Sequence, residues 1–209
     1  VLFESVDAMQ GGRQRYSYGR WGTPTSDALE AAVSELEGAA GSVLCPSGLA
    51  AGTVALLSCL SAGDRILIVD SVYGPIRRFA GTVLARLGIE AAYYDPALGA
   101  EIEELFTDNT RAVYAEAPGS LTFEMQDLPA IAQVAHRHGA TVLFDNTWAT
   151  PLFFRPLDFG ADLSIHAGTK YLGGHSDVML GTVAANAAAW PGLQQTYRVL
   201  GMHVGPDDV

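Results

Sequence analysis

Two rhythms of apolar residues alternate along the chain from residue 25 onward. Apolar residues three or four apart, as in Leu29, Val33 and Leu36, are typical of one buried helix face, and Thr25 is placed to cap that helix. The run 65–70 is almost continuously aliphatic, as expected of a strand covered on both faces in a parallel sheet. The alternation predicts one α/β domain with a mostly parallel sheet and right-handed crossovers.

The same patterns give approximate bounds for each element. Helices are expected over 25–37, 47–60, 76–87, 100–106 and 128–138. Strands are expected over 42–45, 65–70, 91–94, 111–116, 141–145, 162–166 and 178–184, and the segment 1–6 is also strand-like. In folds of this kind ligands lie beyond the carboxyl ends of the strands, so functional residues are expected in the loops that follow strands.

Charge and composition narrow the function classes. The 209 residues carry 12 basic and 23 acidic side chains, a formal net charge of −11, which argues against nucleic acid and anionic membranes as partners. Charged residues make up 17%, below the roughly 25% of ordinary soluble domains, so extra buried surface such as a subunit interface is expected. Two cysteines, Cys45 and Cys59, fit reduced thiols in a cytoplasmic protein better than a disulfide scaffold.

The loops after the expected strands hold the candidate chemistry. They span 46–49, 71–74, 117–120, 145–148 and 168–171. Lys170 lies in the last of them and is the only lysine in the chain. A lone lysine in a Gly-Thr-Lys turn is unusual as mere surface charge, although a compositional preference for arginine with one surviving lysine explains it equally well.

Each of the other candidates has an ordinary structural explanation. Asp145 can be a turn or capping carboxylate, Tyr73 a packing aromatic, and Ser47-Gly48 a simple helix start whose N–H groups are open to an anion. Their combination with Lys170 is more specific. A lysine for a Schiff base, an acid for a pyridinium nitrogen, a stacking ring and a phosphate site are what pyridoxal phosphate (PLP) requires.

Longer motifs point to a family. They are YGR at 18–20, TPT at 23–25, ELEG at 35–38, DNTWA at 145–149 and GTKYLGGHSD at 168–177. Together they resemble the Cys/Met-metabolism family of PLP-dependent enzymes, over essentially the whole chain. The resemblance implies fold type I, with an aspartate-aminotransferase-like, three-layer major domain over 25–209. It also implies that 1–24 reaches a neighbouring subunit and that a C-terminal small domain lies outside this chain.

Two further motifs bear on the reaction. The runs EAPGSLTFE at 116–124 and DFG at 158–160 leading into SIH at 164–166 resemble the bacterial cystathionine β-lyase branch. That branch implies β-elimination from cystathionine or cysteine-type thioethers, giving a thiol, pyruvate and ammonia. Two alternatives stay open: an enzyme of the cystathionine γ-synthase or γ-lyase type, and a catalytically incomplete fragment that only binds PLP.

The resemblance also implies roles for individual residues. Lys170 would carry the cofactor as a Schiff base and act as general base, Asp145 would hold the pyridine nitrogen, and Tyr73 would stack on the ring. The phosphate would be held by Gly48, Leu49 and Thr169, and by Tyr18 and Arg20 from the neighbouring subunit. Ser120 would bond the ring hydroxyl, and Thr147 is included among the cofactor-binding residues.

Some positions depart from the family pattern. Ala167 replaces a second phosphate-binding serine, and Ser17, Trp21 and Arg78 stand where the closest β-lyases carry other residues. These departures leave the substrate open while the cofactor chemistry is kept. A dimer is expected as the minimum active unit and a tetramer as the full assembly, with a small amino-acid substrate. No metal site is expected, because His136 and His138 lie two residues apart, the wrong spacing for one helical face.

Overall fold

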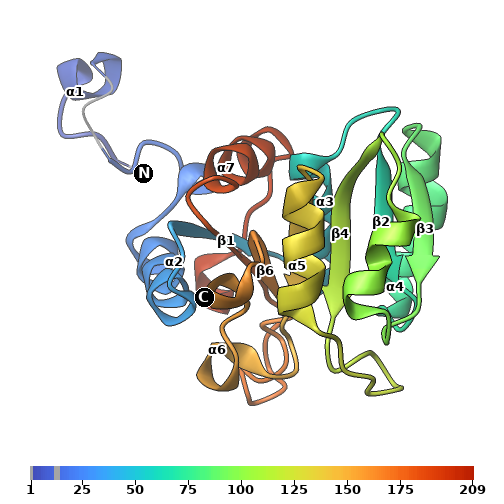
Figure 1. The fold of residues 1–209 in the computed structure, drawn as a ribbon. Helices are drawn as coiled ribbons and strands as arrows, with labels where there is room; N and C mark the ends of the chain where they lie inside the picture. The colour runs from blue at the N-terminus through green and yellow to red at the C-terminus, as the bar shows by residue number, and fades with distance from the viewer. Residues whose placement is uncertain (1, 12–14) are drawn as a thin grey trace.

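A seven-stranded sheet forms the centre of the molecule. The computed structural model describes residues 2–11 and 15–209. The strand order is β1-β7-β6-β5-β4-β2-β3, in which β7 is antiparallel to both neighbours and every other neighbouring pair is parallel. The predicted α/β fold with a mostly parallel sheet is therefore confirmed (Figure 1).

The strands agree with the predicted positions to within about three residues. They are β1 (Gly41–Cys45), β2 (Arg65–Val69), β3 (Glu90–Tyr94), β4 (Thr110–Glu116), β5 (Thr141–Asp145), β6 (Leu163–His166) and β7 (Gly181–Ala185). The expectation of a strand over 178–184 was wrong at its start, since residues 178–180 still belong to a loop. The strand expected over 1–6 does not form: residue 1 lies outside the described residues, and a short helix begins at Val6, capped by Ser5.

Helices fill most of the chain between strands. They are α1 (Val6–Gln10), α2 (Pro24–Glu37), α3 (Gly48–Cys59), α4 (Gly74–Phe79), α5 (Leu128–Arg137), α6 (Thr150–Phe153) and α7 (Trp190–Val199). The short helices are η1 (Gly19–Trp21), η2 (Ala80–Leu84), η3 (Gly99–Leu105), η4 (Pro156–Phe159) and η5 (Pro206–Asp208). The helix predicted over 76–87 starts two residues earlier and passes into the π-helical η2, whereas the one over 100–106 is 3₁₀. Sequence reasoning missed α6 and α7.

The start of α2 corrects one expectation. Thr23 and not Thr25 is the capping residue: its hydroxyl accepts a hydrogen bond from the Ser26 N–H at 3.1 Å, and the Ser26 hydroxyl accepts one from the Thr23 N–H at 2.8 Å. Pro24 then occupies the first turn, where a missing N–H costs nothing. At the other end Gly38 adopts a left-handed conformation with φ of 67°, which ends the helix.

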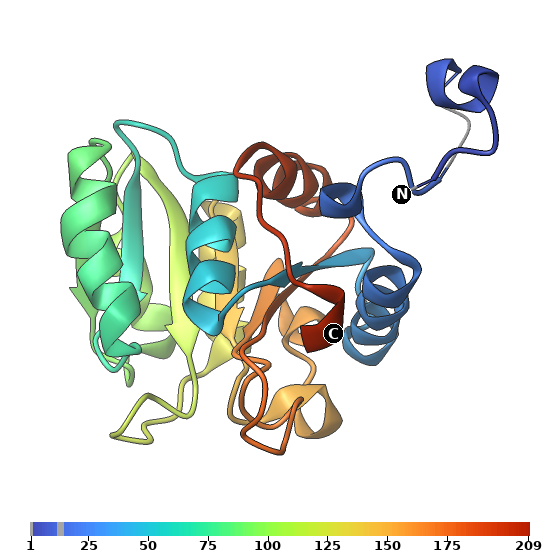
Figure 2. The ribbon, with the colours of Figure 1, turned by 180° about the vertical axis from the view of Figure 1, so that it is seen from behind.

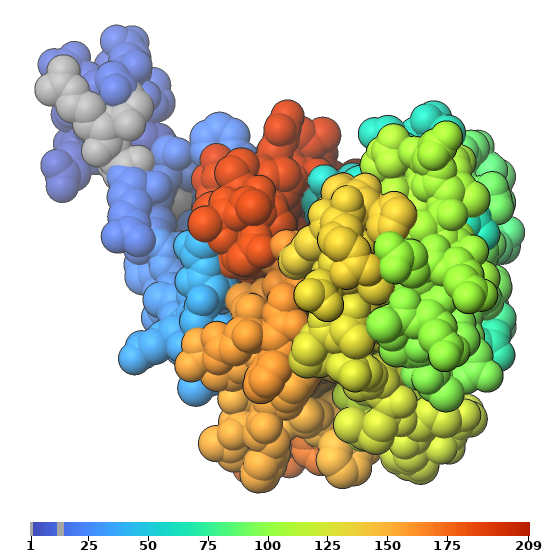
Figure 3. All heavy atoms as spheres, in the orientation of Figure 1, coloured from blue at the N-terminus to red at the C-terminus, as the bar shows by residue number. Residues whose placement is uncertain are grey.

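The helices cover the sheet on both faces. Figure 1 shows α5 in front of the sheet, and Figure 2 shows α3 and α4 on the opposite side with α7 beside α3. The buried apolar residues of β2, β4 and β5 lie between these layers and form one continuous core. In the space-filling view α1 stands away from this body (Figure 3).

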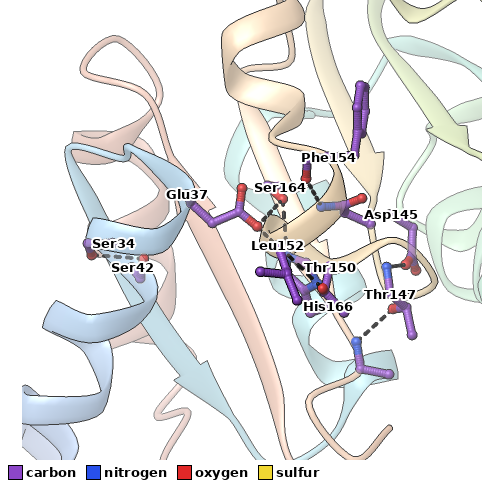
Figure 4. A network of polar contacts seen from close by, with 12 residues as sticks. Ser34, Glu37, Ser42, Asp145, Thr147, Thr150, Leu152, Phe154, Ser164 and His166 are labelled. Carbon is purple, nitrogen blue, oxygen red and sulfur yellow. Dashed lines mark hydrogen bonds and ion pairs between the residues drawn. The ribbon is translucent and has the colours of Figure 1, made fainter. Parts of the chain in front are cut away.

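A buried polar contact joins α2 to the sheet. Glu37, the last residue of α2, is fully buried, and its carboxylate forms an ion pair with the His166 imidazole of β6 (Figure 4). The Ser164 hydroxyl also donates to this carboxylate at 2.9 Å. The second Glu37 oxygen and the Nδ1 of His166 have no hydrogen-bond partner among the described residues. A buried carboxylate is tolerated only when paired, so each partner depends on the other.

We expect Glu37→Ala to lower the free energy of unfolding by about 3 kcal/mol, because it leaves His166 buried without its partner. Urea unfolding followed by circular dichroism measures this change. Glu35→Ala, on the exposed face of the same helix, is the matched control and should change stability little. Equal losses in the two variants would mean that the ion pair contributes nothing specific.

Candidate active site

Loops from the carboxyl ends of several strands enclose one cavity. Its volume is about 1070 Å³. Eight of the ten predicted site residues line it: Gly48, Leu49, Tyr73, Ser120, Asp145, Thr147, Thr169 and Lys170. In Figure 1 the loops that follow β4, β5 and β6 emerge together at the lower edge of the sheet, and Figure 3 shows them side by side on the surface. The cavity is large enough for a cofactor together with a small substrate.

The N-terminus of α3 forms one wall of the cavity. Ser47 caps this helix by accepting a hydrogen bond from the Ala50 N–H at 3.1 Å. Gly48 and Leu49 are the first two residues of α3, and the N–H groups of a first helical turn have no partners within the helix. A Cβ at Gly48 would lie 2.5 Å from the Ala167 Cβ, so glycine lets this helix end approach the loop that carries Lys170. Such a helix start is suited to bind a phosphate.

Lys170 projects from the loop that follows β6. Its backbone is fixed in a turn, because its N–H donates to the Ala167 carbonyl at 2.9 Å and its carbonyl accepts from the Gly174 N–H at 2.7 Å. The side chain is exposed toward the cavity and makes no hydrogen bond or ion pair with any described residue. The amine is therefore available to a ligand.

Asp145 lies at the carboxyl end of β5, on the cavity floor. Its carboxylate accepts a hydrogen bond from the Thr147 N–H at 3.0 Å and lies 3.4 Å from the Tyr114 hydroxyl. Burial raises the pKa of Asp145, while the Thr147 hydrogen bonds and the nearby His166 oppose that rise. No Lys or Arg side chain among the described residues pairs with it. A cation bound in the cavity would offset the cost of burying the ionised Asp145 carboxylate.

Thr147 and Thr169 organise the loops around Asp145 and Lys170. The Thr147 hydroxyl accepts a hydrogen bond from the Ala167 N–H at 2.8 Å, which ties the loop after β5 to the loop after β6 (Figure 4). The Thr169 hydroxyl donates to the Leu180 carbonyl at 3.1 Å and accepts from the Leu180 N–H at 3.0 Å. A phosphate contact from Thr169 would therefore have to replace the bond to Leu180, because a hydroxyl has one proton to donate.

Tyr73 and Ser120 lie on two further loops at the cavity. Tyr73 directly precedes α4 and is 46% exposed, so its ring is accessible to a ligand in the cavity. The Ser120 N–H donates to the Ser71 carbonyl at 2.9 Å, which holds the loop after β4 against the loop after β2. Both residues are positioned by backbone contacts and keep their side chains free.

Two of the predicted residues do not line this cavity. Arg20 donates to the Arg198 carbonyl at 2.9 Å and lies 5.4 Å from the centre of the Tyr18 ring, near α7. Tyr18 is 53% exposed. Their predicted contact with the phosphate of a neighbouring subunit stays a prediction. Among the departing positions, Ala167 lines the cavity, whereas Ser17, Trp21 and Arg78 do not.

Sequence reasoning missed several residues of the cavity. Glu116, at the end of β4, is paired in register with Asp145 and lines the cavity, but the motif that contains it indicates no role for this residue. The aromatic side chains Phe123, Trp148 and Tyr171 also line the cavity wall. Glu116 had a detectable signal, since it ends a strand as Asp145 does. The aromatics had none, because their loops carry no periodicity that predicts where a side chain points.

The donor set fits pyridoxal phosphate. The fit rests on a half-buried carboxylate that lacks a basic partner, a lysine amine without protein partners, an accessible aromatic ring and a helix N-terminus, all facing one cavity. PLP offers the complementary groups: an aldehyde for the amine, a basic ring nitrogen for the carboxylate and a phosphate for the helix.

Other kinds of site are not found in the described residues. No group of three or more His, Cys, Asp or Glu side chains is placed to hold a metal ion within residues 2–11 and 15–209. In the same part of the chain, no helix has the length and apolar character needed to cross a membrane. Both cysteines are free thiols.

Comparison with known proteins supports this chemistry. A Rhizobium johnstonii protein, provisionally named a cystathionine beta-lyase, is 60% identical over 208 residues, which cover 100% of this chain and 52% of that protein. Escherichia coli cystathionine beta-lyase MetC is 40% identical over 214 residues, covering 99% of this chain and 54% of MetC. The crystal structure of cystathionine gamma-lyase from Lactobacillus plantarum, complexed with L-serine, matches with a TM-score of 0.92 at 32% identity. That match covers 100% of this chain and 53% of the other.

The chain spans about half the length of the curated relatives it matches. The family model described as "Cys/Met metabolism PLP-dependent enzyme" matches residues 2–209. The match thus extends over nearly all of the sequence, including every strand of the sheet and every loop of the cavity. This chain belongs to the Cys/Met-metabolism family of PLP-dependent enzymes.

Proposed function

We propose that the protein is a carbon–sulfur lyase that acts by β-elimination on cystathionine or related cysteine thioethers. The observation that carries this proposal is the convergence of Lys170, Asp145, Tyr73 and the start of α3 on one cavity. The relatives named cystathionine beta-lyase, at 40% and 60% identity, support the substrate class. The expected products are a thiol, pyruvate and ammonia.

Lys170 is the residue that both anchors the cofactor and moves a proton. When bound, PLP supplies an electron sink for the substrate carbon that loses its proton. With substrate bound, the free Nζ of Lys170 would accept the α-proton as general base.

Asp145, Tyr73 and α3 hold the cofactor during that step. The Asp145 carboxylate would keep the pyridine nitrogen protonated, which sustains the electron sink. The Tyr73 ring would cover one face of the cofactor and limit access of water. The N–H groups of Gly48 and Leu49 would bind the phosphate at the positive end of α3.

Other relatives favour two further candidate reactions. Cystathionine gamma-lyase of Bacillus subtilis is 40% identical over 194 residues, and L-alanine/L-glutamate racemase of Wolbachia pipientis is 41% identical over 207 residues. All three reactions begin with removal of the α-proton and differ in the bond that breaks or forms after it. The departures from the family pattern at Ser17, Trp21, Arg78 and Ala167 fit a change of substrate within this shared chemistry.

We also propose self-association, with a dimer as the minimum active unit and a tetramer as the full assembly. Tyr18 and Arg20 lie away from the cavity of their own chain, which is compatible with their serving the cavity of a neighbour. The exposed aromatic side chains of Trp148 and Phe153 offer apolar surface that a neighbouring subunit could cover. The two free thiols fit a reducing compartment such as the cytoplasm.

Product analysis tests the proposed reaction. With cystathionine as substrate, we expect pyruvate to accumulate and 2-oxobutyrate to stay at background, as measured by chromatography of the derivatised keto acids. 2-Oxobutyrate as the main product would indicate γ-elimination. Racemisation of L-alanine without release of either keto acid would indicate a racemase. A protein that binds PLP and yields none of these products would refute the lyase assignment.

Lys170 should be the attachment point of the cofactor. Reduction of the PLP-loaded protein with borohydride should give one stable adduct, located by peptide mass spectrometry at Lys170, the only lysine in these 209 residues. Lys170→Ala should lose both the adduct and all elimination activity. Lys170→Arg keeps the positive charge and is the matched control, which should behave like the alanine variant. An adduct that persists in either variant would rule out this residue.

Asp145→Asn should leave the cofactor bound but slow removal of the substrate α-proton on the order of a hundredfold. The neutral amide cannot hold the ring nitrogen in its protonated form, so the electron sink weakens more than binding does. Exchange of the α-hydrogen in deuterated water, followed by NMR, measures the first effect, and absorbance titration with PLP measures the second. Asp108→Asn, an exposed position, is the control. Equal loss of exchange and binding would instead indicate a structural role for Asp145.

A further inference from the structure

Glu116 is a buried carboxyl group at the site that the proposed mechanism does not use. It ends β4, is 8% exposed and lines the same cavity as Asp145. The two residues are register partners across the parallel β4–β5 pair, so their side chains lie next to each other on one face of the sheet. Two adjacent carboxyl groups in a half-buried site cannot both ionise without cost.

Glu116 forms a hydrogen bond to the loop that follows β2. Its Oε2 accepts a hydrogen bond from the Tyr73 N–H at 2.8 Å, across 43 residues of sequence. Its own carbonyl accepts from the Gln126 side-chain amide at 2.6 Å, and the Gln126 oxygen in turn accepts from the Tyr94 hydroxyl at 2.7 Å. Gln126 thus holds the backbone of Glu116, and the side chain of Glu116 holds the backbone of Tyr73, whose side chain lines the cavity.

The charges around Glu116 decide where a proton resides. The charged form of Asp145 on β5 acts on Glu116, and burial together with the charges of Asp145 and Glu116 raises the pKa of Tyr114 on β4. Lys170, after β6, lines the same cavity. Burial raises the pKa of Asp145, while the hydrogen bonds from Thr147 and the attraction of His166 oppose that rise. Burial, and next the charge of Asp145, raise the pKa of Glu116 to about 8. Burial and the neighbouring carboxylate thus favour the protonated form of Glu116.

We propose that Glu116 is a positioning residue of this site: it holds the Tyr73 backbone through a carboxyl oxygen, and it carries the proton that leaves Asp145 ionised. The inference rests on the proposed function for its meaning, because Tyr73 and Asp145 matter as cofactor contacts. A neutral acid suits both tasks, since its carbonyl oxygen still accepts the Tyr73 N–H while it adds no second negative charge beside Asp145.

The first test separates the hydrogen bond from the charge. Glu116→Gln keeps an acceptor oxygen and is neutral, whereas Glu116→Leu keeps the bulk and loses the acceptor. The PLP dissociation constant, from absorbance titration of cofactor-free protein, should stay within about threefold of the native value in the Gln variant. The dissociation constant should rise about tenfold in the Leu variant, because that variant loses one hydrogen bond. Induced circular dichroism of bound PLP should fall in Leu alone.

Glu124→Gln and Glu124→Leu are the matched controls, because Glu124 is an exposed carboxylate in the same loop. They should bind PLP as the native protein does. Equal weakening in Glu116→Gln and Glu116→Leu, or native binding in Glu116→Leu, would overturn the positioning role. The measured quantity is PLP affinity, so a protein that binds PLP but fails to cleave cystathionine would refute the proposed function and leave this inference standing.

The second test addresses the proton. Because the pKa of Glu116 is raised above that of the unfolded chain, the folded protein holds a proton that the unfolded chain has lost between about pH 4.5 and 8. The thermal midpoint of the cofactor-free native protein should therefore fall as the pH rises through this window. Glu116→Gln should show a shallower fall, while Glu124→Gln should follow the native protein. Identical pH dependence in native protein and Glu116→Gln would overturn the proton assignment, whether or not Glu116→Leu folds.

Discussion

The hydrogen-bonded register of three central strands is the constraint on which the site depends. Glu116 at the end of β4 pairs with Asp145 at the end of β5, and Asp145 pairs with Ile165 of β6. The strands run parallel and end level with one another, so the loops that follow them leave the sheet at one edge. A shift of one residue in either pairing would turn Asp145 to the other face and take it out of the cavity.

The two faces of the sheet have different tasks because side chains alternate along each strand. The face toward α3 carries Tyr114, Glu116 and Asp145, and the N-terminus of α3 meets the cavity there. On the opposite face Ser164 and His166 meet the carboxylate of Glu37. The buried ion pair thus fixes the end of β6 from behind, just before the loop that carries Lys170, without occupying the cavity.

A small number of ionisable side chains is enough to bind a charged ligand in this cavity. Among the described residues that line the cavity, the amine and carboxyl groups are those of Lys170, Glu116, Asp145 and Asp177. In a partly desolvated space each charge has a larger effect than at the surface. One lysine without a protein partner and two adjacent carboxyl groups form a preorganised set into which a ligand with an aldehyde, a basic nitrogen and a phosphate fits.

The sequence by itself determined the fold class, the order of the main elements and the loops that hold Lys170, Asp145, Tyr73 and Gly48. Apolar periodicity and local motifs encode those features, because they depend on residues that are near in the chain. The tertiary structure alone decided that β7 runs antiparallel, that Thr23 caps α2, and that Glu37 pairs with His166 and Glu116 with Asp145. The two side-chain pairs join segments far apart in sequence. The cap of α2 depends on competition between two neighbouring threonines, Thr23 and Thr25. Only the packed chain fixes which ionisable groups share a low-dielectric space, because that depends on side chains brought together from distant parts of the sequence.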